Sequence, residues 1–151
     1  MSKSKRTAMD IVKLFLKLQG LDEDSGDVIT NLKAQKLLYY AQGVALAETG
    51  QPLFDEDFRN WQHGPVIPEV YQKLKQFGSN QIELDEELNE SLFSDSELEM
   101  LIRAYRSFGQ YSAWKLRDMT HAEAPWRDTK PDEVITKGAI KKYFDVHYAS
   151  I

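Results

Sequence analysis

Residues 32–47, LKAQKLLYYAQGVALA, decide the fold. The first turn is polar, but between residues 37 and 47 only Gln42 is clearly polar, because the two tyrosines have apolar bodies. Leu37, Ala41 and Val44 recur at the spacing of one helix face, and the flanks of that face are apolar as well. A helix with apolar side chains around most of its circumference is buried by neighbours on several sides. We therefore expect the rest of the chain to pack around this helix.

Capping residues mark both ends of this central helix. Thr30 is a favoured N-cap, and Gly50 suits the left-handed residue that ends a helix. These ends predict a helix of about 20 residues, or roughly 30 Å. Gly43 lies in its interior, where glycine costs about 0.5–1 kcal/mol relative to alanine. We expect another backbone to approach the helix closely at Gly43.

Shorter elements are expected on both sides of the central helix. Capping residues and apolar spacing predict further helices that begin at Thr7, near Pro68, at Ser94, at Ser112 and at Thr136. Residues 58–62, FRNWQ, predict a short strand, and residues 134–135 are a second β candidate. Residues 120–126 are expected to be irregular, because a residue before proline disfavours helix. The predicted fold is mainly α: one compact domain over residues 1–151, a helical bundle around a buried central helix with a short β element.

The composition excludes several classes of protein. The chain has 151 residues, 42% hydrophobic and 28% charged, and no apolar run reaches the ~18 residues of a membrane span. The N-terminus is basic, but Lys13 and Lys17 follow too soon for a signal peptide. Cysteine is absent, which excludes disulfides and Cys-ligated zinc and fits a cytoplasmic location. The net charge of −5 argues against a nucleic-acid binder that relies on bulk charge.

Two histidines and one glutamate are the candidates for chemistry. His63, His121 and Glu123 are a conceivable set for a small hydrolase or a metal site, since histidine titrates near neutral pH and both residue types bind metals. Their spacing matches no HExxH motif, and the chain has no GxSxG, Walker or GxGxxG sequence. The alternative for His63 is a neutral side chain that hydrogen-bonds within a tight Gly-Pro turn. We expect no metal, no cofactor and no catalytic residue.

Aromatic and acidic residues each have a structural and a functional interpretation. Four aromatic residues could stack nucleic-acid bases: Trp61, Tyr71, Trp114 and Trp126. The acidic net charge instead favours their filling a small core. Tyr39 and Tyr40 are also expected to pack, with one ring pointing outward. Residues 83–99 contain many acidic side chains and no Lys or Arg, which predicts either a solvated face or a patch that steers a basic partner.

Three sequence blocks carry a family resemblance. The first is KAQKLLYYAQG at residues 33–43. The second joins GQPLF at residues 50–54 to WQHGPVIP at residues 61–68 and Tyr71. The third is YSAWKL at residues 111–116, followed by Thr120-His121 and Pro125-Trp126. With IKKYF at residues 140–144, these blocks cover most of the chain, and it resembles the Panacea-domain family of SocA-like or GepA-like proteins, often encoded in prophages.

The resemblance implies a helical antitoxin of a bacterial or phage toxin–antitoxin system, with a cognate protein toxin as its partner. Such domains act by direct binding or by passing the toxin to a protease. A DNA-binding autoregulator is a rival function, for which only the last helix is moderately basic, through Lys137, Lys141 and Lys142. Neither a membrane nor a nucleic acid is expected as a partner.

The predicted contact surface joins the first turn of the central helix to the turn after the first strand. The residues expected to bind the partner are Lys33, Lys36, Tyr39, Tyr40, Gln62, His63 and Gly64. Both lysines are expected on the exposed side of the helix. This surface is favoured as the contact site because a rigid helix and a Pro-fixed turn present polar and aromatic groups at low entropic cost. The residues expected to act as scaffold are Gly43, Trp61, Pro65, Pro68, Tyr71, His121, Pro125 and Trp126.

Overall fold

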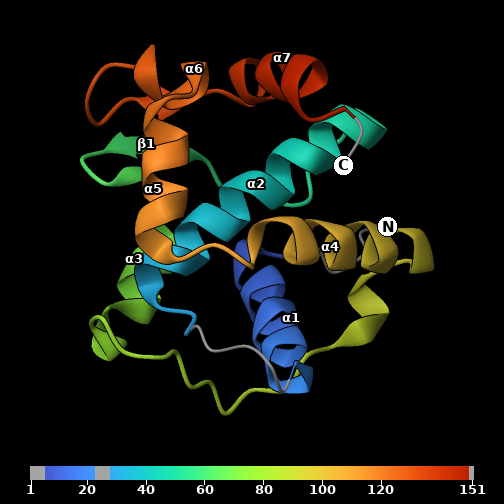
Figure 1. Ribbon diagram of the computed structural model, residues 1–151. Helices are drawn as coiled ribbons and strands as arrows, with labels where there is room; N and C mark the ends of the chain where they lie inside the picture. The colour runs from blue at the N-terminus through green and yellow to red at the C-terminus, as the bar shows by residue number, and fades with distance from the viewer. Residues whose placement is uncertain (1–5, 23–27, 150–151) are drawn as a thin grey trace.

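The computed structural model describes residues 6–22 and 28–149, and this part of the chain is mainly α, as predicted (Figure 1). Its α-helices are α1 (Ala8–Leu21), α2 (Asn31–Thr49), α3 (Pro68–Leu74), α4 (Asp95–Phe108), α5 (Ala113–His121), α6 (Ala124–Arg127) and α7 (Lys137–His147). Its strands are β1 (Phe58–Trp61), β2 (Gly64–Val66) and β3 (Val134–Ile135). Two 3-10 helices complete it, η1 (Lys75–Phe77) and η2 (Glu90–Leu92).

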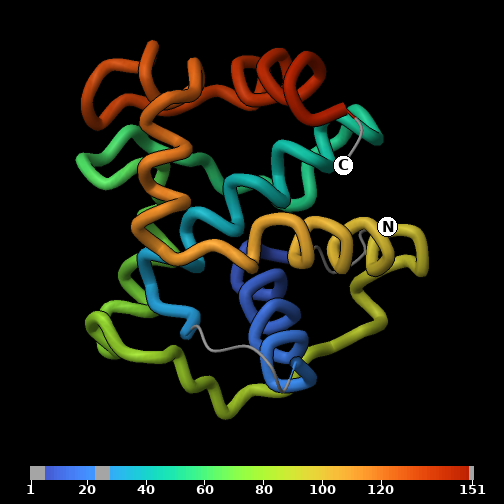
Figure 2. The backbone as a smooth tube through the Cα atoms, in the orientation of Figure 1, coloured from blue at the N-terminus to red at the C-terminus, as the bar shows by residue number. Residues whose placement is uncertain are grey.

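Helix α2 is the central helix that the sequence predicts. The Thr30 hydroxyl caps it by accepting from the Lys33 amide, and Gly50 ends it in the left-handed conformation with φ of 75°. Helix α7 lies on one side of α2, α4 and α1 lie on the other, and α5 crosses its N-terminal half (Figure 1). Figure 2 shows the same arrangement as a backbone tube. Because neighbours surround α2, 15 of its 19 residues are buried.

The close approach at Gly43 comes from a side chain and not from a backbone, so that part of the prediction is wrong. A Cβ atom added at Gly43 would overlap the ring of Phe144, which reaches α2 from α7. Phe144 is fully buried and packs against the rings of Tyr39 and Tyr40. Glycine at this position therefore lets α7 lie directly on α2.

The three strands form one antiparallel sheet in the order β2-β1-β3. Strand β1 pairs Arg59 with Val66 on one side and Phe58 with Ile135 on the other. The predictions of β1 and β3 are confirmed, but the sequence was expected to form only a turn where β2 lies. Pro65 is compatible with β2 because proline, which has no N–H donor, occurs in edge strands.

The predicted helix starts at Thr7, Pro68, Ser94, Ser112 and Thr136 agree with the structure. The irregular segment expected over residues 120–126 is wrong, because α5 continues to His121 and α6 begins at Ala124. Pro125 occupies the second position of α6, where a backbone N–H would lack an intrahelical acceptor anyway. Within the described ranges, no helix combines the length and the apolar character needed to cross a membrane.

Candidate functional site

Two lysines of α2 are buried and hold distant backbone carbonyl groups. Lys33 is 2% exposed and its ammonium donates to the carbonyl of Gly109 over 2.8 Å. Lys36 is 0% exposed and its ammonium donates to the carbonyl of Pro65 over 2.9 Å. The expectation that both lysines lie on the exposed side of α2 is therefore wrong. Their stems pack in the core while their ends satisfy carbonyl groups outside α2.

Two glutamines of α2 hold backbone groups in the same way. Gln35 accepts from the amide of Ile67 over 2.9 Å and donates to the side chain of Asn31 over 3.0 Å. Gln42 accepts from the amide of Leu53 over 2.7 Å and donates to the carbonyl of Phe54 over 3.0 Å. Gln42 thus holds the backbone that precedes β1, and Gln35 holds the backbone that follows β2. We call the buried polar side chains that hold backbone groups in this way the clamps.

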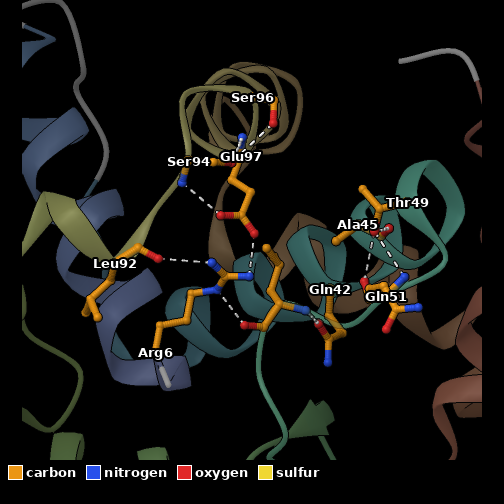
Figure 3. Close-up of polar contacts among 10 residues, drawn as sticks. Arg6, Gln42, Ala45, Thr49, Gln51, Leu92, Ser94, Ser96 and Glu97 are labelled. Atoms are coloured by element: carbon orange, nitrogen blue, oxygen red, sulfur yellow. Dashed lines mark hydrogen bonds and ion pairs between the residues drawn. The ribbon is translucent and has the colours of Figure 1, made fainter. Parts of the chain in front are cut away.

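Arg6 extends these clamps from the start of α1 (Figure 3). Its guanidinium donates to the carbonyl groups of Leu53 and Leu92, over 2.7 and 3.1 Å, and forms an ion pair with Glu97. Glu97 in turn accepts from the Ser94 amide at the start of α4. The loop that Gln42 holds is therefore fixed from both sides.

Gly64 and Lys36 fit each other at the start of β2. Gly64 has φ of +112°, and an added Cβ would lie 2.5 Å from Cε of Lys36 and 2.8 Å from Oγ1 of Thr120. Glycine therefore lets the edge strand sit directly on the lysine side chain. Burial, with a smaller contribution from the nearby charge of Arg117, lowers the pKa of Lys36 to about 7. Lys36 positions the turn that carries Gln62 and His63, both of which are exposed.

Three tyrosines converge on one buried carboxylate. Tyr39 donates to Oε1 of Glu123 over 3.0 Å, while Tyr40 and Tyr148 donate to Oε2 over 2.8 and 2.6 Å. Both tyrosines of α2 are fully buried, so the prediction of one outward ring is wrong. Burial raises the pKa of Glu123, and the three hydroxyl donors act in the opposite direction. This carboxylate links α2, the α5–α6 junction and the end of α7.

The two histidines of the proposed hydrolase set have different neighbours. His121 stacks on Trp126 at a centroid distance of 3.9 Å, and the indole of Trp126 donates to the carbonyl of Trp61 over 2.9 Å. Burial, followed by the charge of Arg117, lowers the pKa of His121. His63 is exposed and its Nδ1 accepts from Nε of Arg117 over 3.3 Å. Among the described residues, no group of three or more His, Asp or Glu is placed to hold a metal.

The surface beside the His63 turn is hollowed into a groove of about 920 Å³. Its walls come from the N-terminal ends of α2 and α5, the β1–β2 turn, α3 with η1, and residues 131–132. Trp61 and Tyr71 line it with their rings 5.2 Å apart, edge to face. Trp114 lines it too and is 58% exposed, so the expectation that this tryptophan fills the core is wrong.

Helical spacing contained a signal for the exposure of Trp114. The buried side of α5 carries Leu116 and Thr120, which are four residues apart and share a face. Trp114 lies two residues before Leu116, on a different side of the helix. We therefore place the candidate functional site at the groove, with Gln62, His63 and Trp114 on its walls.

Several charged side chains elsewhere form ion pairs within the molecule. On α7, Lys137 pairs with Asp57 and Lys141 with Asp145, which reduces the basic character of the helix considered for DNA binding. In the acidic segment over residues 83–99, Glu86 pairs with Lys13, Glu90 with Lys17 and Glu97 with Arg6. Arg6 and helix α1 together therefore neutralise part of the acidic segment.

Comparison with protein families matches much of the part of the chain that builds the clamps and the groove. Residues 34–127 match the family described as "Antitoxin SocA-like, Panacea domain". The chain is 33% identical over 110 residues to Antitoxin SocA of Caulobacter vibrioides, an alignment that covers 65% of this chain and 58% of that protein. The chain thus spans little more than half the length of this relative, and no solved structure matches it. Because the family match covers more than half of the sequence, the chain belongs to the SocA-like antitoxin family with the Panacea domain.

Proposed function

We propose that this chain is the antitoxin of a toxin–antitoxin pair and that it neutralises a protein toxin by direct contact, without catalysis. The observation that carries the proposal is the match of residues 34–127 to an antitoxin family, supported by the likeness to Antitoxin SocA. The groove supports a binding function, since exposed aromatic groups on a rigid frame are typical of protein interfaces.

The contacts of the histidines and Glu123 favour a binder over a hydrolase. Both oxygens of Glu123 accept hydrogen bonds from buried tyrosines, so this carboxylate serves as a structural acceptor. The ring of His121 stacks on Trp126, which gives it a packing contact of its own. Of the residues first considered for partner contact, Gln62 and His63 keep that role in our proposal because they are exposed on the groove. Lys33, Lys36, Tyr39, Tyr40 and Gly64 are buried, so in our proposal they act on the partner only through the frame that they form.

The test is co-expression with the product of the neighbouring reading frame. We expect that product to stop growth when expressed alone, and we expect this chain to restore growth and to co-purify with it. Immunoblots of the toxin separate two routes: an unchanged toxin level indicates direct neutralisation, whereas a falling level indicates delivery to a protease. A neighbouring product without toxicity, or rescue without a complex, would refute the proposal.

A second arm addresses the rival enzymatic function. His63→Ala and His121→Ala are made in this chain, and folding is checked by circular dichroism. If a folded variant still binds the toxin but no longer restores growth, a catalytic function replaces the proposed one.

A further inference from the structure

The groove gathers exposed apolar side chains that the fold itself does not use. Within the described residues, four large apolar side chains are exposed: Leu21, Val28, Trp114 and Val146. Two of these four, Val28 and Trp114, line the same groove. Clustering of apolar surface in a concave site marks a place where another molecule binds.

We propose that this groove captures a short, extended segment of the toxin that carries a bulky apolar side chain and, next to it, an acidic residue. The apolar side chain packs against Trp61, Tyr71 and Trp114, and the acidic residue pairs with Lys75. This inference rests on the proposed antitoxin function and adds to it the chemistry of the segment that is recognised.

The aromatic wall is held in place before any partner arrives. The Trp114 ring meets the His63 ring edge to face at 5.6 Å, and the guanidinium of Arg117 lies 5.3 Å from the Trp114 ring centre. Also on the groove, the indole N–H of Trp61 donates to Asp132 over 3.2 Å. A pre-ordered aromatic surface loses little conformational entropy on binding, so more of the contact energy becomes affinity.

The volume of the groove favours a segment over a folded surface. About 920 Å³ is at the upper end of the range for sites that enclose a drug-sized molecule. A site of this size holds a few side chains, which a short segment can supply. A standard interface between two folded faces instead buries about 800 Å² on each partner, spread over many residues.

The charges in the groove favour an acidic neighbour for the apolar side chain. Of the described residues lining the groove, only Lys75 and Asp132 carry a formal charge when histidine is neutral. Oδ1 of Asp132 already accepts from Trp61. Lys75 is exposed and makes no ion pair with any described residue. In a chain of net charge −5, the groove therefore offers an anion a cationic partner that pairs with none of the residues that the structure describes.

The test measures binding of the neighbouring gene's product to the purified chain, followed by binding of overlapping 15-residue peptides that cover that product. Trp114→Ala is expected to weaken binding of the full product by about 30-fold or more, as for an aromatic hot spot. Lys75→Glu is expected to weaken binding by about 5- to 10-fold, and less at high salt. The matched controls are Val146→Ala and Lys142→Glu, an exposed apolar and an exposed basic residue outside the groove, and both should bind like the parent.

A charge exchange makes the test specific. In the peptide that binds best, the acidic residue is replaced by Lys, which should weaken binding to the parent and restore binding to Lys75→Glu. Unchanged binding of the full product by Trp114→Ala and Lys75→Glu would overturn the groove inference and leave the antitoxin function standing. Binding of the full product without binding of any peptide would overturn it in favour of a folded surface. If the full product does not bind the parent, the proposed function fails and this inference fails with it.

Discussion

Replacing Lys36 by Met is expected to remove a rise in stability with pH. Burial lowers the pKa of Lys36 from 10.5 to about 7 in the folded chain, whereas the unfolded chain keeps the ordinary value. Between these two pKa values the unfolded chain binds more protons than the folded chain, so the free energy of unfolding increases as the pH rises. Below about pH 7 both states are protonated, and the buried charge has its full destabilising effect.

The size of the effect follows from the pKa difference. One pKa unit corresponds to about 1.4 kcal/mol, so the parent should gain about 2 kcal/mol between about pH 6 and about pH 8.5 from Lys36 alone. For a chain of this length, that gain is about 4–8 °C in melting temperature. The methionine leaves the Pro65 carbonyl without its donor, which costs about 1–3 kcal/mol at every pH and therefore does not change the slope.

The assay is urea unfolding followed by tryptophan fluorescence, at several pH values from about 6 to 8.5. Measurement stops at about pH 8.5 because of the tyrosines around Glu123, whose pKa is raised by burial. Near pH 10 these tyrosines ionise only in the unfolded chain, so there the free energy of unfolding falls as the pH rises. The difference between the parent and Lys36→Met removes the contribution of Glu123. It retains the smaller part of the His121 pKa shift that the Lys36 charge causes. Lys142→Met controls for loss of an exposed ammonium. Parallel pH profiles of the parent and Lys36→Met would refute the reasoning.

Three further predictions concern packing and association. Gly43→Ala should cost about 1–3 kcal/mol because its Cβ overlaps the Phe144 ring, and Phe144→Leu in the same chain should recover part of that loss in urea unfolding. Trp126→Ala should destabilise by about 2–4 kcal/mol, somewhat less than a fully buried tryptophan, since the ring is partly exposed but stacks on His121; an unchanged thermal melt would contradict this. If the acidic segment steers a basic toxin, the association rate should fall as salt rises, and less so after Glu86→Gln with Glu87→Gln; a flat salt response in both proteins would assign the segment to solubility.

Local patterns predicted the helices well, because periodicity and caps act within a few residues. Thr30 and Gly50 set the ends of α2, and both signals lie beside the helix that they limit. Strand β2 could not be predicted in the same way. It exists because β1 pairs with it and α2 holds its edge, through Gln35 on the Ile67 amide and Lys36 on the Pro65 carbonyl.

The buried lysines show why the candidate site was harder to predict than the fold. A lysine near the start of a helix is usually solvated, and the residues beside Lys33 and Lys36 give no sign of the carbonyl groups that they meet. The carbonyl groups that justify burial are 76 residues from Lys33 and 29 residues from Lys36. Only the tertiary fold brings them together, and the same is true of the groove, which four separate segments build around Trp114.

The carboxylate shared by Tyr39, Tyr40 and Tyr148 makes distant parts of the chain unfold together. Glu123 is buried, so detaching the end of α7 removes one donor from a group that water does not reach. Losing the Tyr148 hydrogen bond also weakens the hydrogen-bond network that joins Glu123 to α2. Opening of either helix therefore destabilises the other. We therefore expect amide protons of α2 and α7 to exchange with solvent through one common opening, as in a single cooperative unit.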